Sequence, residues 1–188
     1  MLISFLISFP LHLQNRIQIQ VCSLLQTISL VTLVSNFGSI FLLSLILLVP
    51  AIQLVNAESS LIRECTFQNN TARKASIYCD NSDLTIRDCY FSNSTVETLV
   101  LTSNSTFSFS NLNIQNNKMR KAIMMIEVST GTIQDSLIYN SNQQATGLEI
   151  VYSNCIMTNI TSQYNTAPFG ASLFVANSDV SVSHSTFR

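Results

Sequence analysis

The chain of 188 residues contains no tryptophan, only four glycines and three prolines, and only 10% charged residues. Soluble domains usually carry about 25% charged residues. The scarcity of glycine and proline excludes a collagen-like chain and a proline- or glycine-rich linker. Nine basic and ten acidic residues leave a net charge of −1, so the chain lacks the basic surface of a nucleic-acid-binding protein, and we expect no nucleic-acid partner.

Charge is almost absent from the first third of the chain. Residues 17–57 contain no charged side chain, and residues 1–57 contain only Arg16. Residues 58–188 hold all the other charges and are rich in serine, threonine and asparagine. The sequence therefore divides into a hydrophobic N-terminal segment, 1–57, and a domain of ordinary size, 58–188, which neutral polar side chains keep soluble.

The hydrophobic segment predicts export of the domain that follows it. An apolar run over residues 37–49 and the small residues at 55–57 are typical of a helical secretory signal and its cleavage site. Residues 37–55 are also just long enough for a retained transmembrane helix, which would give the chain a membrane contact. A buried globular helix is a third interpretation. The two leading alternatives make residues 58–188 secreted or membrane-anchored on the extracytoplasmic side.

A repeat of about 24 residues runs through the second part of the chain. The segments "LIRECTFQNN" and "TIRDCYFSNS" begin at Leu61 and Thr85, and they share the motif I-x-x-C-x-F-x-N. The motif recurs in weaker form to the end of the chain, with apolar residues at its first position throughout. These first positions are Ile62, Ile86, Phe109, Ile133, Met157 and Val182.

Each repeat predicts short strands separated by polar turns. The apolar segments alternate with polar residues, and none offers the ten or more residues at helical spacing that a helix would need. One lap of 24 residues around a narrow solenoid would stack equivalent residues in columns about 4.8 Å apart. A β-sandwich is the alternative, but it predicts no such agreement between columns. We expect an all-β solenoid of about five coils, preceded by the apolar N-terminal helix.

Asparagine occupies one position of the repeat in every copy. An inward-facing ladder of amides, each bonded to the next coil, would explain this column and would satisfy its buried polar groups. The residues assigned to this ladder are Asn69, Asn93, Asn116, Asn140 and Asn165.

With these motifs, residues 59–188 resemble a right-handed parallel β-helix of the pectin-lyase-like architecture. The coils are similar to polymorphic outer-membrane-protein-type repeats, which carry an F-x-x-N element. Residues 67–70 match that element, and residues 114–117 match it with isoleucine for phenylalanine. The G-G-A-[ILV] element of those repeats is replaced here by segments such as "KAS" and "GAS". The resemblance implies a fold and carries no catalytic chemistry.

One column of the repeat could hold catalytic or metal-binding carboxylates, since polysaccharide-cleaving β-helices need such clusters. Arg63 and Arg87 lie beside its first two acids, which favours a solvated kink instead. We therefore assign no catalytic, cofactor-binding or metal-binding residue and no cofactor. The column is Glu64, Asp88, Asn111, Asp135, Asn159 and His184.

The cysteines leave two interpretations open. Cys65 and Cys89 occupy equivalent positions of adjacent coils, within the Cα separation that a disulfide needs. Parallel side chains fit disulfide geometry poorly, so a reduced stack in the core is the alternative. Cys155 shares its column with apolar residues and is expected in the core.

Four N-x-[ST] sequons follow residue 57. Because an N-glycan must lie on the surface, we expect glycosylation at Asn104, in a polar turn, and at Asn159, in the kink column. Asn69 and Asn93 belong to the expected inward ladder, so little glycosylation is predicted there.

These features favour a non-enzymatic secreted or cell-surface β-helix, acting in adhesion or glycan contact, with glycans or cell-surface proteins as partners. The alternative is a fragment of a polysaccharide-active lyase or hydrolase of the same fold. The chain stops within an expected strand, so residues 58–188 are interpreted as truncated at the C-terminus.

Overall fold

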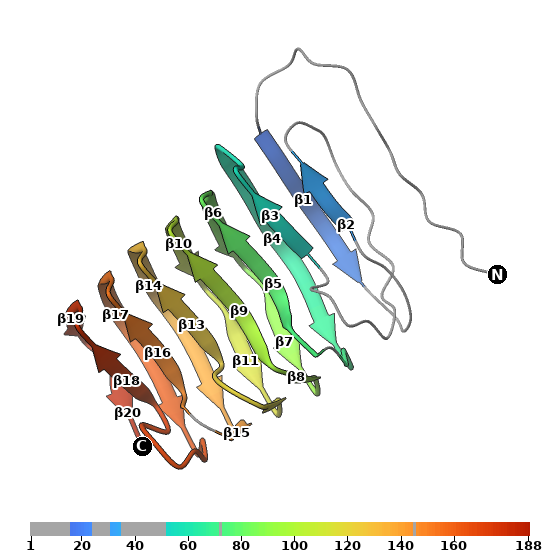
Figure 1. Cartoon of the computed structure of the whole chain (residues 1–188). Coiled ribbons are helices and arrows are strands. Elements are labelled where there is room, and N and C mark those ends of the chain that lie inside the picture. Colours follow the sequence, from blue (N-terminus) through green and yellow to red (C-terminus); the bar gives the residue numbers. More distant parts are fainter. Residues whose placement is uncertain (1–15, 24–30, 35–51, 72, 145) are drawn as a thin grey trace.

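The computed structural model describes residues 16–23, 31–34, 52–71, 73–144 and 146–188, with backbone alone for the first two ranges. This part of the chain is all strand and turn, and the strands pair in parallel from coil to coil (Figure 1). The predicted all-β parallel solenoid is confirmed. The expected N-terminal helix falls on residues 37–49, which lie outside the described residues.

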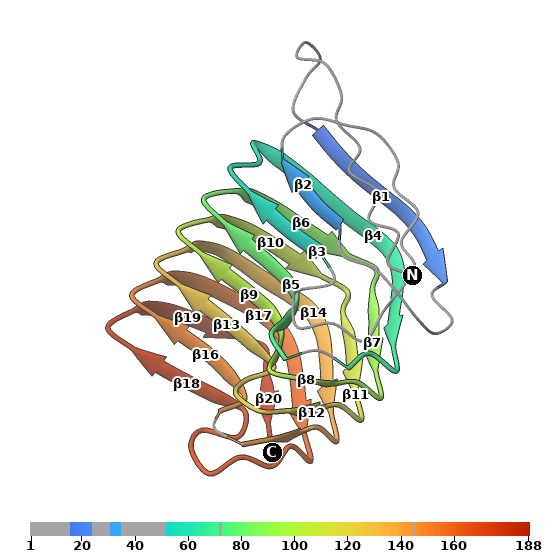
Figure 2. The same ribbon diagram turned by 45° about the vertical axis from the view of Figure 1, so that its right-hand side comes forward.

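Each coil visits three sheets in turn (Figures 1 and 2). The first sheet has seven strands: β2 (Val31–Val34), β3 (Ile52–Val55), β5 (Ala75–Asp80), β9 (Thr98–Ser103), β13 (Met124–Glu127), β16 (Leu148–Val151) and β18 (Leu173–Ala176). The second has ten: β1 (Arg16–Ser23), β4 (Ser59–Gln68), β6 (Asp83–Arg87), β7 (Tyr90–Ser92), β10 (Thr106–Ser110), β11 (Asn113–Gln115), β14 (Thr130–Tyr139), β17 (Asn154–Gln163), β19 (Asp179–Ser183) and β20 (Thr186–Phe187). The third has three short strands: β8 (Thr95–Val96), β12 (Lys118–Met119) and β15 (Asn142–Gln143).

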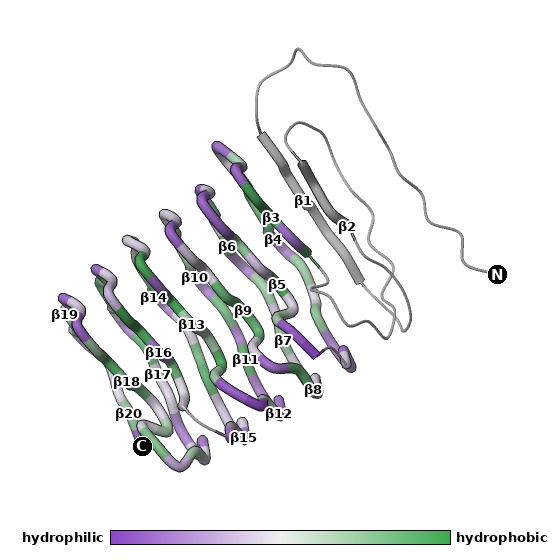
Figure 3. The backbone as a smooth tube through the Cα atoms, in the orientation of Figure 1, coloured by the Kyte–Doolittle hydropathy of each residue, from purple (hydrophilic) through white to green (hydrophobic). Residues whose placement is uncertain are grey.

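The register confirms the columns expected from the sequence. Ile62 pairs with Ile86, which pairs with Phe109, and this column continues to Val182. The column of Phe67 and Phe91 is equally regular, and their rings stack in the core with centroids 4.7 Å apart. Apolar side chains from every face thus fill the interior of the solenoid, and hydrophilic residues gather in the turns around β8 and β12 (Figure 3).

Three corners in each coil bend the chain from one flat segment to the next. All seventeen non-glycine residues with positive φ among the described residues lie on these corners, with φ between 46° and 57°. Asparagine and aspartate tolerate this left-handed conformation better than other non-glycine residues. The first corner consists of Asn56, Asn81, Asn104, Val128, Tyr152 and Asn177, the second of Glu64, Asp88, Asn111, Asp135, Asn159 and His184, and the third of Asn69, Asn93, Asn116, Asn140 and Tyr164.

The predicted inward asparagine ladder is wrong by one residue. Asn69, Asn93, Asn116 and Asn140 lie on the third corner and are exposed, because the left-handed residue turns its side chain outward. Their equivalent in the next coil is Tyr164, since Tyr139 pairs with Gln163. Asn165 belongs to the following, inward column.

The inward ladder exists at that following position, which turns back into the core. The backbone N–H of Ser94 donates to Oδ1 of Asn117 at 3.0 Å, and that of Asn117 donates to Oγ of Ser141. The N–H of Ser141 then donates to Oδ1 of Asn165 at 3.0 Å. Each side chain thereby satisfies a backbone donor that the corner leaves out of the sheet pairing.

A matching serine ladder follows the first corner. Ser105 is typical: its Oγ accepts from the N–H of Ser82 at 3.1 Å and donates to the carbonyl of Ser103. The same pattern links Ser129 to Ser153 at 3.0 Å. The Asn-Ser pairs that recur along the sequence thus have separate tasks, with asparagine making the turn and serine satisfying it.

The sequence predicts that the coils start at residue 58, but in the structure the stack of coils begins before that residue. Strand β3 pairs with β5, and Ile52 and Leu54 are fully buried in the same core. Strands β1 and β2 pair with β4 and β3. These strands add a coil at the N-terminal end. The first corner accordingly has six residues, one for each of six coils, where the sequence predicts about five coils. Cleavage or anchoring of segment 1–57 stays a prediction.

Val128 is strained on the first corner, and replacing it is expected to stabilise the protein. It is a β-branched residue with φ 48° and a side chain that is 57% exposed, so it gains little from packing. Left-handed conformation costs such residues about 1–2 kcal/mol. We expect Val128→Asn to raise the free energy of unfolding by about 1 kcal/mol, or about 2–4 °C in melting temperature.

Thermal melting followed by circular dichroism would measure this change. Ile156→Asn is the control, because Ile156 is also β-branched and 56% exposed but lies in the extended strand β17. An equal rise in melting temperature in both variants would mean that replacing any exposed apolar side chain with asparagine stabilises the protein. No rise for the Val128 variant would contradict the strain at this corner.

Candidate functional site

The column that the sequence singled out for catalysis or metal binding forms the second corner. All six of its residues are exposed, and their backbones adopt the left-handed conformation. Side-chain bonds run between adjacent coils, from Asn111 Nδ2 to Asp88 Oδ1 at 2.7 Å and from Asn159 Nδ2 to Asp135 Oδ1 at 2.9 Å. This column is a solvated turn on the surface of the solenoid.

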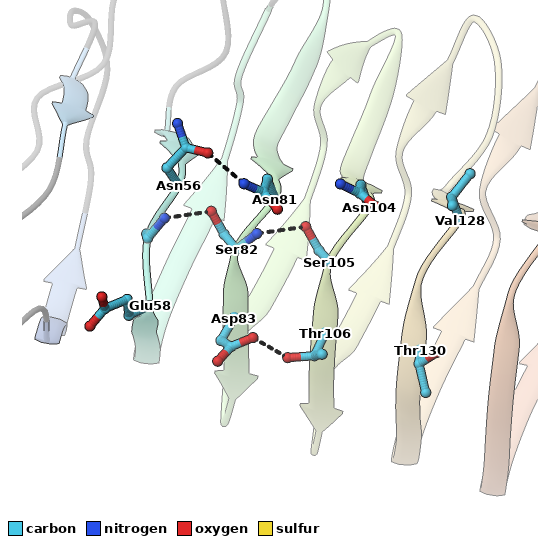
Figure 4. Close-up of a pocket in the computed structure, with 11 residues that line it drawn as sticks. Asn56, Glu58, Asn81, Ser82, Asp83, Asn104, Ser105, Thr106, Val128 and Thr130 are labelled. Atoms are coloured by element: carbon cyan, nitrogen blue, oxygen red, sulfur yellow. Dashed lines mark hydrogen bonds between the residues drawn. The ribbon is translucent and has the colours of Figure 1, made fainter.

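A groove lies instead along the first corner, with a volume of about 510 Å³ (Figure 4). Four adjacent coils build it, each contributing its corner residue and one or both of the two residues that follow the corner. Its lining is Asn56, Ala57, Glu58, Asn81, Ser82, Asp83, Asn104, Ser105, Thr106, Val128 and Thr130.

Nine of the eleven residues that line the groove have polar side chains, and several of these are hydrogen-bonded to one another. Asn81 Nδ2 donates to Asn56 Oδ1 at 2.6 Å, and Thr106 Oγ1 donates to Asp83 Oδ1 (Figure 4). The buried serine ladder beneath them fixes the backbone. Each amide and carboxylate still has acceptor or donor capacity directed outward, because one bond uses only part of it.

The groove repeats similar polar groups at intervals of one coil, about 4.8 Å. A ligand with hydroxyl groups along an extended chain could pair with successive coils. Exposed aromatic rings continue the same surface, because Tyr152 follows Val128 on the first corner and is 64% exposed. Amides, carboxylates and an aromatic ring together can bind a hydroxylated ligand, since the ring packs on its apolar faces.

The sequence motifs do not predict this groove, although part of the signal is present in them. Glu58 lies next to the expected cleavage site, which hides its relation to Asp83 in the next coil. Asn81 and Asn104 are evident in the sequence as separate polar turns and not as parts of one surface. Aligning the residue after each turn would have placed Asp83, Thr106 and Thr130 in one outward column.

The predicted glycosylation residues are both exposed. Asn104 lies on the first corner and lines the groove, and Asn159 lies on the second corner. Their glycosylation stays a prediction. Asn69 and Asn93 were expected to be hidden, but the structure exposes both.

Cys65 and Cys89 are present as thiols in the core on adjacent coils. Their side chains are hydrogen-bonded to each other, and this bond lowers the pKa of Cys89 against the opposing effect of burial. Cys22 is the register partner of Cys65 in β1, so three cysteines share one column.

Cys79 and Cys155 are also core residues, but their thiol pKa is not lowered. Burial raises the pKa of Cys79 to about 11 and that of Cys155 to about 12. Cys155 pairs with Val180, in the apolar column expected from the sequence. Both thiols therefore stay protonated at neutral pH and pack as small apolar side chains.

Two further observations concern the described residues only. They contain no group of three or more histidine, cysteine, aspartate and glutamate residues arranged to hold a metal ion. Nor does this part of the chain include a helix long and apolar enough to cross a membrane.

Comparison with known proteins agrees with this architecture. Residues 49–118 match a family model described as "Right handed beta helix region". No curated protein and no solved structure matches the chain. The matched range runs from just before β3 to the start of β12. By its repeat, its parallel register and this match, the described part of the chain from β3 onward has the fold of a right-handed parallel β-helix, consistent with the pectin-lyase-like architecture.

Proposed function

We propose that this protein is a non-enzymatic secreted or cell-surface β-helix that contacts glycans through the first-corner groove. The observation that carries the proposal is the lining of that groove, in which amides, hydroxyls and carboxylates recur from coil to coil. Glycans or glycan-bearing cell-surface proteins are the partners, and adhesion is the process that such contact serves.

The chemistry of the groove supports a neutral, hydroxyl-rich ligand. The asparagine amides both donate and accept hydrogen bonds, as sugar hydroxyls do. Glu58 and Asp83 add acceptors, and charge-assisted hydrogen bonds to a carboxylate are stronger than neutral ones. The groove contains no lysine or arginine, so it offers no partner to sulfated or phosphorylated sugars.

Export is part of the proposal and rests on the hydrophobic segment 1–57. Cleavage of this segment would release a secreted protein, whereas retention would leave it anchored in a membrane. Either outcome presents the groove to extracellular glycans.

Cleavage of a polysaccharide is the second candidate, because two carboxylates from adjacent coils face the same groove. Glu58 and Asp83 could act as acid and base on a bound sugar chain. Against this, Thr106 Oγ1 donates a hydrogen bond to Asp83 Oδ1, so this carboxylate oxygen is already engaged in a contact within the fold.

An oligosaccharide array would test the proposed function. The protein is produced in bacteria without N-glycans, so that a sugar on Asn104 cannot fill the groove. We expect binding to neutral oligosaccharides at micromolar Kd or weaker, with sulfated ones no better, and no new reducing ends after prolonged incubation. Products from a bound oligosaccharide would favour the enzyme, and absence of any binding would contradict glycan contact.

A further inference from the structure

Two sequons lie on the third corner, far from the groove. Asn69 is followed by Thr71, and Asn93 by Thr95. Both asparagines are exposed and have the left-handed φ of corner residues, 57° and 51°. Their side chains therefore project from the solenoid, while the residues after them form the buried ladder.

The rest of each sequon is equally accessible. Thr71 and Thr95 are exposed and pair in parallel register, so the two sequons are equivalent segments of adjacent coils. Within the described residues the side-chain amides of Asn69 and Asn93 make no hydrogen bond, whereas the side-chain amide of Asn140 on the same corner donates to Asn116 Oδ1. A sugar on either amide would thus break no contact of the fold.

We propose that Asn69 and Asn93 are N-glycan acceptors. The co-reactant is a lipid-pyrophosphate-linked oligosaccharide. The amide Nδ2 forms a bond to the anomeric carbon of the first sugar, the bond from that carbon to the pyrophosphate oxygen breaks, and the lipid pyrophosphate leaves. The amide loses one proton to the transferring enzyme's base, and no redox change occurs.

The position of these glycans separates them from the glycan-binding surface. In one coil, the chain passes from Asn81 on the first corner through β6 and β7 before it reaches Asn93 on the third. Glycans on the third corner would leave the groove open, whereas one on Asn104 would lie in it. This inference depends on one part of the proposed function, the export of the domain, and does not depend on glycan binding in the groove.

The test uses the full chain in a eukaryotic secretory host, both as it stands and behind a known secretion signal. Glycans are removed from the native protein with a peptide N-glycosidase in heavy-oxygen water, which marks each released site for mass spectrometry. We expect marks at Asn69 and Asn93 without prior unfolding. Unoccupied sites in translocated protein, or sites released only after unfolding, would overturn the proposal.

A matched pair of variants tests whether any sequon on the third corner is glycosylated, and not only the two sequons present in the natural sequence. Lys118 is the register partner of Thr95, two residues after the corner residue Asn116. Lys118→Thr is expected to add one glycan, at Asn116, with an unchanged melting temperature, and Lys118→Ala to add none. No added glycan, or an unfolded protein, would overturn the corner assignment.

Failure of export is distinguishable from failure of this inference. Glycosylation only behind the added signal would remove the proposed secretory role of residues 1–57 and would support the acceptor sites. Absence of glycans at both sites in both forms, with the protein in the medium, would overturn the acceptor sites and leave export standing.

Discussion

Phe109→Asp is expected to prevent folding of the solenoid. Phe109 is fully buried in the column that runs from Ile62 to Val182, and its ring lies 5.0 Å from that of Phe107. Loss of a buried phenylalanine costs about 3–5 kcal/mol, and an unpaired carboxylate in the core adds to this. The total reaches the stability of a typical domain, about 5–15 kcal/mol. Loss of the strand spectrum and of a cooperative melt by circular dichroism would show the effect.

The neighbouring Ser108 provides the control, because its side chain is exposed on the same strand, β10. Ser108→Asp should change the free energy of unfolding by about 0.5 kcal/mol or less. Ser92, the neighbour of Phe91, would not serve, since it is only 1% exposed. Similar melting of both aspartate variants would mean that the inward and outward assignment is wrong.

Asn117→Ala is the second substitution with a large expected effect. The Asn117 side chain is buried, accepts from the N–H of Ser94, and donates to the carbonyls of Phe91 and Gln115, with each bond at 3.0 Å. Alanine leaves three buried backbone groups without these partners, and each such group costs about 1–3 kcal/mol. We expect a loss of about 3 kcal/mol or more in the free energy of unfolding, measured by urea denaturation.

The adjacent Asn116 is the matched control. It is exposed on the third corner with φ 55°, a conformation that glycine adopts without strain. Asn116→Gly is expected to change stability by about 1 kcal/mol or less. If Asn116→Gly destabilised the protein more than Asn117→Ala, the ladder predicted from the sequence, which contains Asn116, would be right. The ladder seen in the structure, which contains Asn117, would then be wrong.

Most of the fold followed from the sequence because columns repeat. Six apolar residues at intervals near 24, from Ile62 to Val182, define a lap length and hence a parallel register. A core position tolerates few residue types, so apolar character persists even where the motif has weakened. For this reason the sequence correctly predicts the inward columns that start at Ile62 and Phe67 and the inward position of Cys155.

The phase of the asparagine column could not be obtained in the same way. Strict alternation predicts that Asn69, two residues after Phe67, faces inward like it. The left-handed corner breaks the alternation, because it rotates the chain so that the corner residue points outward, as Asn116 does, and the next residue points inward, as Asn117 does. Only the backbone conformation distinguishes the two cases. The substitution of Tyr164 in the same column is the one clue in the sequence, since tyrosine would not fit an amide ladder.

The groove was beyond the sequence for a different reason. Its residues come from four coils and share no motif, since the position two residues after the corner is acidic in Glu58 and Asp83 and threonine in Thr106 and Thr130. What they share is a place after the first corner, which becomes visible only once the register is known. The groove proposed to bind glycans is therefore built from outward columns, whereas the repeat that reveals the fold consists of inward ones.

Calorimetric titration of an array-selected oligosaccharide into Asn81→Gly and Asn111→Gly tests the groove most directly. Both residues are exposed asparagines in the left-handed conformation, and each donates its amide to the preceding coil, but only Asn81 lines the groove. Glycine keeps both turns, so the variants differ in place and not in strain. We predict a Kd weakened about tenfold for Asn81→Gly, equivalent to about 1.4 kcal/mol, and an unchanged Kd for Asn111→Gly. Equal affinity in the two variants, or loss of binding only in Asn111→Gly, would contradict glycan contact through the first-corner groove.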